Sequence, residues 1–212
     1  MTRAELKALA KQQIKGNIGI LFVMSLIVSV ITALPNILSS IPFLGFVFSI
    51  GLLFINAAFS LSLMIIYLAL TAGKKPQIAD IFIGFNDIWS AFKVTFLVGL
   101  FTFLWSLLFV IPGIVKACSY SQAMFILAEN PGMSAREAIN RSKKMMEGHK
   151  MDYFVLGLSF FGWILLAGLT FGILLIWLVP YMQATLANFY NSVKPVAVVE
   201  DAPVVDGEAV TE

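Results

Sequence analysis

The densest group of side chains that could do chemistry lies between Arg136 and Lys150. This stretch holds five of the fourteen Lys and Arg residues and the one histidine of the chain, His149. Asp152 follows three residues later, so a helix would bring its carboxylate next to the imidazole. A metal site needs several ligands at defined spacing, and the sequence has no second histidine. We therefore expect His149 to be a solvated residue, and we expect no bound metal and no other cofactor.

The rest of the sequence offers no recognisable catalytic constellation. It contains no glycine-rich phosphate loop, and no serine can form a Ser-His-Asp triad without a buried histidine. Lys116 and Glu129 are the ionisable residues nearest to buried depth, and both lie at predicted helix ends. Cys118 is the only cysteine, which excludes an internal disulfide, and we expect it to be a small apolar packing residue. These features predict that the protein is not an enzyme.

The basic residues near His149 have two further interpretations. Nucleic-acid binding needs a strongly basic surface, but acids balance the bases in and around this stretch. These acids are Glu129, Glu137, Glu147 and Asp152. Retention of positive charge on the cytoplasmic side of a membrane explains the bases better. We expect no nucleic-acid partner.

The composition predicts a membrane protein. The chain is 59% hydrophobic and only 12% charged, whereas soluble domains average about 45–50% and about 25%. Three long segments, 16–73, 94–115 and 153–193, contain no Asp, Glu, Lys or Arg. A membrane-spanning helix needs about 20 apolar residues, so these segments are long enough for several crossings.

Charge placement predicts six spans with both termini in the cytoplasm. The basic segments 1–17, 74–93 and 136–150 share the cytoplasmic side only if an even number of spans separates each from the next. The expected fold is all-α, with six transmembrane helices in three hairpins. The spans are predicted near 18–34, 45–71, 94–111, 114–128, 153–168 and 173–192. We expect the first span to be retained, because its apolar run is longer than that of a signal peptide.

Helix-breaking residues mark the turns within these hairpins, at 35–42, at 111–113 and at 168–172. Pro180 is expected to interrupt the last span. The fourth span, 114–128, is short and contains several polar residues. It either crosses in a tilted, partly buried form or folds back as a re-entrant helix, because polar segments at membrane depth must be covered by protein.

Amphipathic segments are expected to precede the hairpins at the cytoplasmic face. Thr2 and Ser134 each begin a capping-box pattern, which predicts a helix start, and Gly148 is expected to end the helix that begins at 135. One side of that helix is less polar and carries Ala135, Ala138, Ile139, Ser142, Met145 and Met146. Its other side carries the bases Arg136, Arg141, Lys143 and Lys144. We expect this basic helix to lie on the inner membrane face, with its bases toward water or anionic headgroups.

Polar residues inside the predicted spans form a candidate polar pocket. They are Asn56, Ser60, Ser119, Tyr120, Gln122, Gln183 and Asn188. One interpretation is that they make hydrogen bonds between helices, worth on the order of 1 kcal/mol each. The other is a polar pocket or path bounded by proline-broken helices, as transporters use.

The chain is expected to form one membrane domain, 1–193, followed by a disordered acidic tail, 194–212. After Lys194 the sequence carries five acids and no base, and its Pro and Gly residues break any helical period.

Several pieces of the sequence resemble a known family. They are Pro112-Gly113, Tyr120-Ser121, Ala138 with Arg141-Ser142, Gly148, the segment 160–163, Pro180-Tyr181 and the N-terminal "ELKALAKQQIKGN". In combination they resemble the uncharacterised bacterial integral-membrane family catalogued as domain of unknown function 975. The resemblance implies a multi-span protein of the bacterial inner membrane. It supplies no established activity and no site residues.

The expected function is therefore that of a membrane-embedded helper or binding protein for a partner, a lipid or a small substrate. The alternative is a small-solute transporter or channel. Expected partners are the lipid bilayer, through anionic headgroups at the cytoplasmic face, and a second copy or another membrane protein.

Overall fold

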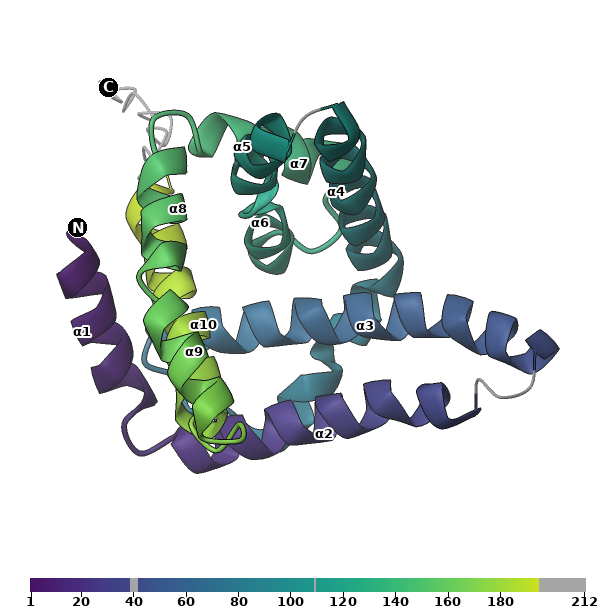
Figure 1. Cartoon of the computed structure of the whole chain (residues 1–212), viewed down its shortest axis with the longest axis horizontal. Helices are drawn as coiled ribbons and strands as arrows, with labels where there is room; N and C mark the ends of the chain where they lie inside the picture. The colour runs from purple at the N-terminus through teal and green to yellow at the C-terminus, as the bar shows by residue number, and fades with distance from the viewer. Residues whose placement is uncertain (39–41, 109, 195–212) are drawn as a thin grey trace, which may run out of the picture.

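The computed structural model describes residues 1–38, 42–108 and 110–194, and every regular element in these ranges is a helix (Figure 1). In chain order the elements are α1 (Arg3–Ile14), α2 (Ile18–Leu38), α3 (Pro42–Thr71), the 3-10 helix η1 (Ile78–Asp87), α4 (Ile88–Leu108), α5 (Val110–Tyr120), α6 (Ala123–Glu129), α7 (Ala135–Met145), α8 (Lys150–Leu158), α9 (Phe161–Leu169) and α10 (Leu175–Val193). The prediction of an all-α fold is confirmed. The predicted disordered tail lies outside the described residues from 195 onward.

Local sequence signals explain several helix ends. At α1, the Thr2 hydroxyl accepts a hydrogen bond from the Glu5 N–H (3.3 Å), and the Thr2 N–H donates to the Glu5 carboxylate (2.9 Å). At α7, the Ser134 hydroxyl accepts from the Glu137 N–H (3.3 Å). Gly148 takes the left-handed backbone conformation (φ 83°), but α7 ends before it is reached. Gly148 therefore shapes the turn between α7 and α8.

The helices α4 and α5 pack against each other, and α5 begins at Val110, just before the predicted break at 111–113. Pro112 lies in the first turn of α5, where a missing N–H costs no helical hydrogen bond. Gly113 lets the two helices touch, because a Cβ there would lie 2.1 Å from the Ser106 hydroxyl oxygen. A second break, which the sequence did not predict, follows Tyr120. The predicted span 114–128 is therefore built from α5 and the short helix α6.

The 3-10 helix η1 lies directly against α3. A Cβ on Gly84 would stand 2.2 Å from the Ala58 carbonyl oxygen, so glycine is needed for this contact. The Gly84 N–H donates to the buried Ser62 hydroxyl (2.9 Å), which in turn donates to the Ala58 carbonyl (3.0 Å). The Asp87 carboxylate, at the end of η1, accepts from the Gly132 N–H (2.9 Å) in the loop after α6. The last turn of η1, directly before α4, is thus held by contacts with α3 and with the loop after α6.

The last helix, α10, packs against α1, α2 and α3. Most of its residues from Leu178 to Tyr190 are buried. It runs through Pro180 without a break, so the prediction that this proline interrupts the segment is wrong. Pro180 has no N–H and so removes one helical hydrogen bond, and the packing of the buried residues that follow it holds the helix.

The apolar side of α1 is covered by protein. Leu6, Ala10 and Ile14 are buried, and α1 packs chiefly along α10. Lys11 lies over the rings of Trp177 and Tyr181 on α10, 6.0 and 5.8 Å from their centres. The first amphipathic helix is therefore part of the bundle.

Four segments of the described chain are long and apolar enough to cross a membrane, and the number rises to five if the bent pair α1–α2 counts as one span. The four are Gly51–Thr71, Ile78–Leu107, Ile111–Glu129 and Lys150–Leu169. The predicted span 173–192 coincides with α10 and is not among them. In Figure 1 the α2–α3 hairpin runs across the view, whereas α4 and the α8–α9 pair run up it. These apolar helices indicate a membrane protein.

Candidate functional site

The seven residues of the candidate polar pocket lie in three parts of the fold. Asn56 and Ser60 are on α3, Ser119, Tyr120 and Gln122 are at the break between α5 and α6, and Gln183 and Asn188 are on α10. Asn56 is exposed, and its amide donates to the Leu52 carbonyl of its own helix (2.8 Å). The hydrogen bonds described below bring Ser119 and Gln122 together around a residue of α7, whereas Asn188 pairs with α1.

The hydroxyl of Ser142 ties α7 to the break between α5 and α6. It donates to the Ser119 carbonyl (2.8 Å) and accepts from the Gln122 N–H (3.2 Å), and its side chain has no exposed surface. The Gln122 amide donates to the Ser121 hydroxyl (2.8 Å), while its Oε1 has no hydrogen-bond partner within the described part of the chain. Backbone groups freed by the helix break are thus bonded by a side chain from another helix.

Asn188 forms a reciprocal amide pair with Gln13 of α1. The Gln13 Nε2 donates to the Asn188 Oδ1 (3.1 Å), and the Asn188 Nδ2 donates to the Gln13 Oε1 (2.6 Å). These residues are 175 positions apart in the sequence. Gln183, five residues earlier on α10, carries a buried Oε1 without a partner among the described residues.

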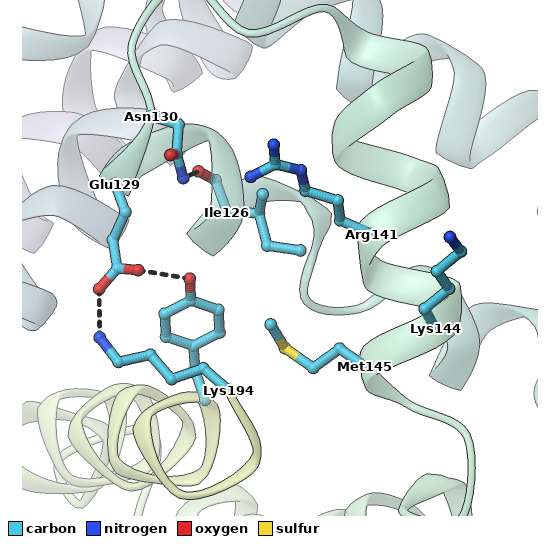
Figure 2. Close-up of a pocket in the computed structure, with 8 residues that line it drawn as sticks. Ile126, Glu129, Asn130, Arg141, Lys144, Met145 and Lys194 are labelled. Carbon is cyan, nitrogen blue, oxygen red and sulfur yellow. Dashed lines mark hydrogen bonds and ion pairs between the residues drawn. The ribbon is translucent and has the colours of Figure 1, made fainter. Parts of the chain in front are cut away.

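The largest hollow among those described is a cleft of about 510 Å³ between α6, α7 and the end of α10 (Figure 2). Its lining consists of Ile126, Glu129, Asn130, Arg141, Lys144, Met145, Tyr190 and Lys194. We name it the α6–α7–α10 cleft. Three cations and one carboxylate line it, so its charge is positive, and its apolar wall comes from Ile126, Met145 and the Tyr190 ring.

Glu129 is the fixed anion of the α6–α7–α10 cleft. Its carboxylate accepts a hydrogen bond from the Tyr190 hydroxyl (2.6 Å). It also forms an ion pair with the Lys194 ammonium (2.7 Å), which Figure 2 shows. The Tyr190 ring stacks on Phe125 of α6, 5.3 Å between centres. These contacts fix the end of α10 against α6. The other two cations of the cleft, Arg141 and Lys144, lie on its α7 side and take no part in these contacts.

The α7 side of the cleft carries Arg141 and Lys144. Arg141 pairs with Glu137 one turn earlier (2.8 Å), and both side chains are about half exposed, so this pair adds little stability. Lys144 is exposed and has no hydrogen-bond or ion-pair partner among the described residues. Figure 2 shows the Arg141 side chain reaching from α7 toward Asn130 on the opposite wall.

The basic helix predicted at 135–146 corresponds to α7. Its predicted less polar side is buried, apart from the half-buried Met145, against α4, α5 and α6. Of its four bases, Arg136 is exposed, and Lys143 lies 5.5 Å from the centre of the Tyr120 ring. Arg136, Arg141 and Lys144 also line a shallow hollow of about 430 Å³ on the outer face of α7.

The other ionisable residues singled out in the sequence lie apart from the cleft. His149 Nδ1 lies 3.6 Å from the Asp152 carboxylate, and the two side chains are about half and about two-thirds exposed, respectively. Within the described residues no group of three or more His, Cys, Asp and Glu side chains could hold a metal ion. The Lys116 ammonium stands 4.6 Å from the centre of the Trp105 ring on α4. Cys118 is buried.

The surroundings of Lys7, on α1, change the pKa of its ammonium group. Its ammonium lies 4.3 Å from the centre of the Phe160 ring and 3.4 Å from the Ser159 carbonyl oxygen, at the joint between α8 and α9. Partial burial lowers the pKa of Lys7, and the positive charges of Arg3 and Lys11 lower it further.

Sequence reasoning missed Tyr190 and Lys194 as members of a site. Tyr190 lies in the last predicted span and Lys194 is the first residue of the predicted tail, and they are separated from Glu129 by 61 and 65 positions. The one indication in the sequence was weak. Glu129 is one of few acids at the edge of an apolar segment, and a partly buried carboxylate needs a partner, but the sequence does not identify that partner.

A family model described as "Protein of unknown function (DUF975)" matches residues 1–119 and 109–197. The chain belongs to this family. The matched region includes every helix of the fold and all residues of the α6–α7–α10 cleft. No curated protein and no solved structure matches the chain. The family resemblance noted in the sequence is therefore confirmed.

Proposed function

We propose that this protein is a non-enzymatic integral membrane protein of the bacterial cell membrane that acts as an embedded helper or binding protein. One observation carries the proposal: large apolar side chains are exposed along α4, α8 and α9. They include Phe103, Leu107, Leu158, Leu165 and Leu169. A water-soluble monomer rarely exposes contiguous apolar surface on this scale, whereas lipid solvates it.

The proposed topology has six spans, with both termini and α7 on the cytoplasmic side. It keeps all cations except Lys116 inside, in agreement with the excess of positive charge in cytoplasmic segments. The turn between α9 and α10 is then external. The exposed Leu169 and Phe171 in this region suit contact with the membrane interface.

Binding is favoured over transport by the way most polar groups are used. The Ser142 hydroxyl is bonded to the Ser119 carbonyl and the Gln122 N–H, and Gln13 and Asn188 are bonded to each other, so these groups are satisfied within the protein. The α6–α7–α10 cleft is lined by α7 and by the ends of α6 and α10. The alternative, a small-solute transporter or channel, is supported by the buried oxygens of Gln122 and Gln183, which have no partner among the described residues. Such oxygens could contact a polar solute.

A pair of measurements on the full chain separates the two functions. A photo-reactive amino acid replaces Met145 in the cleft, with Leu165 on an exposed apolar face as the matched control. A helper gives a discrete adduct in living cells from position 145 that position 165 lacks. Identical adducts from both positions, together with solute flux across proteoliposomes above that of protein-free vesicles, would instead establish transport.

A further inference from the structure

We propose that the α6–α7–α10 cleft binds one phosphate-bearing anion, carried by an anionic lipid headgroup or by a free phosphate ester. The juxtaposition of Arg141 and Lys144 on α7 with the Glu129–Lys194 pair opposite assigns this ligand class. The inference rests on the proposed function, because it names what such a binding protein holds.

The charge of the cleft fits a phosphate. Arg141, Lys144 and Lys194 contribute three positive charges, and Glu129 contributes one negative charge. A phosphomonoester near neutral pH carries between one and two negative charges and a phosphodiester carries one, so either can be neutralised here. The cleft is also open, so an anion can enter without first displacing a helix.

The donors on α7 suit phosphate geometry. A guanidinium has five N–H donors in a planar fork, and the Glu137 pair involves only the Nη2 end of Arg141. Lys144 is three residues further along and also lines the cleft, although in Figure 2 its ammonium points away from the Arg141 guanidinium. A pair of phosphate oxygens can accept from Arg141, and a third oxygen can accept from Lys144 once this exposed side chain rotates toward the cleft.

The same two residues are shared by both hollows of this region. Arg141 and Lys144 line the α6–α7–α10 cleft and also the shallow hollow on the outer face of α7, which adds Arg136 and Asn140. Whichever side the phosphate approaches from, it meets these two cations. They are the residues whose removal tests the site.

Glu129 defines how deeply the anion can enter. Its carboxylate is held in place by Tyr190 and Lys194, and its negative charge repels a second anion placed directly beside it. The phosphate is thereby kept toward the α7 wall, where Met145 offers apolar contact to the carbon atoms attached to it, and Ile126 of α6 offers the same from the opposite side. A glycerol backbone or another small organic group fits that position.

The test uses the purified full chain in detergent. One arm measures retention of phosphatidylglycerol and phosphatidic acid against zwitterionic phosphatidylcholine by native mass spectrometry. A second arm measures thermal stabilisation by inorganic phosphate and glycerol 3-phosphate against chloride at equal ionic strength. A lipid source gives selectivity only in the first arm, and a free phosphate ester gives it in the second.

Two variants carry opposite expectations. Arg141→Gln with Lys144→Gln weakens the bound phosphate species by about tenfold or more, because charge-assisted hydrogen bonds are lost. The matched control, Lys74→Gln with Lys75→Gln, removes the same charge from an exposed loop and leaves affinity unchanged. Glu129→Gln removes the internal anion and strengthens phosphate binding several-fold, an effect that general loss of structure would not produce.

Absence of selectivity for anionic over zwitterionic or chloride probes overturns the proposal, as does equal loss in the cleft and control variants. The outcome is separate from that of the proposed function. A chain that binds phosphatidylglycerol through Arg141 and Lys144 but catalyses solute flux keeps the site and refutes the helper role.

Discussion

Replacing Ser142 by alanine removes a hydroxyl that serves two backbone groups at once. The Ser119 carbonyl loses its 2.8 Å donor and the Gln122 N–H loses its 3.2 Å acceptor, and Ser142 has no exposed surface, so water has no ready route to replace the hydroxyl. A buried group left unsatisfied costs about 1–3 kcal/mol. Because the two losses share one site, we expect a total of about 2–4 kcal/mol for Ser142→Ala.

Thermal unfolding of the detergent-purified chain, followed by tryptophan fluorescence and circular dichroism, measures this cost. For a chain of this size we expect Tm to fall by about 5–10 °C. Ser29→Ala is the matched control, because the Ser29 hydroxyl is exposed and donates only to the Ser25 carbonyl of its own helix. Its Tm should change by about 1–2 °C at most. Equal shifts in the two variants would refute the role assigned to Ser142.

Three further predictions concern other contacts. Gly84→Ala should lower the free energy of unfolding by about 3 kcal/mol or more in chemical unfolding, because η1 must move off α3. Gly99→Ala is the matched control: open space surrounds Gly99, so the variant should be neutral or slightly stabilising. Gln13→Leu should cost about 1–3 kcal/mol by leaving the Asn188 amide unpaired, and adding Asn188→Leu should recover part of that loss in the same assay. The lowered pKa of Lys7 means that its charged form is disfavoured in the folded state. The stability of the fold should therefore rise as the pH increases from the folded-state pKa toward the unfolded value near 10.5. Lys7→Met should flatten this rise in pH-dependent melting curves. A double Gln13–Asn188 variant no more stable than the single one, or an unchanged pH slope in Lys7→Met, would contradict these assignments.

Local chemistry made much of the helical framework predictable. The capping residues Thr2 and Ser134 mark the starts of α1 and α7, and a proline marks the α4–α5 turn, because these signals act within one helical turn. The buried side of α7 followed from its spacing of small and apolar residues. What covers that side did not follow, because period alone does not distinguish lipid from protein.

The rest depends on contacts between distant segments. Gln13 and Asn188 are each ordinary polar residues in amphipathic or apolar helices, and only the packing of α1 on α10 makes them partners. The break after Tyr120 is stable because Ser142, from a helix further along, bonds its freed backbone. The α6–α7–α10 cleft likewise exists only once the end of α10 reaches Glu129. Such pairings leave almost no trace in a single sequence.

The most direct test of the account is the side of the membrane on which α7 lies. Single cysteines replace the exposed Lys144 and Leu169 in a Cys118→Ala background, and a membrane-impermeant maleimide is applied to intact and to permeabilised cells. The account predicts that position 169 is labelled in intact cells and that position 144 is labelled only after permeabilisation. Labelling of position 144 in intact cells would contradict the six-span arrangement, because it would place the α6–α7–α10 cleft on the external side of the membrane.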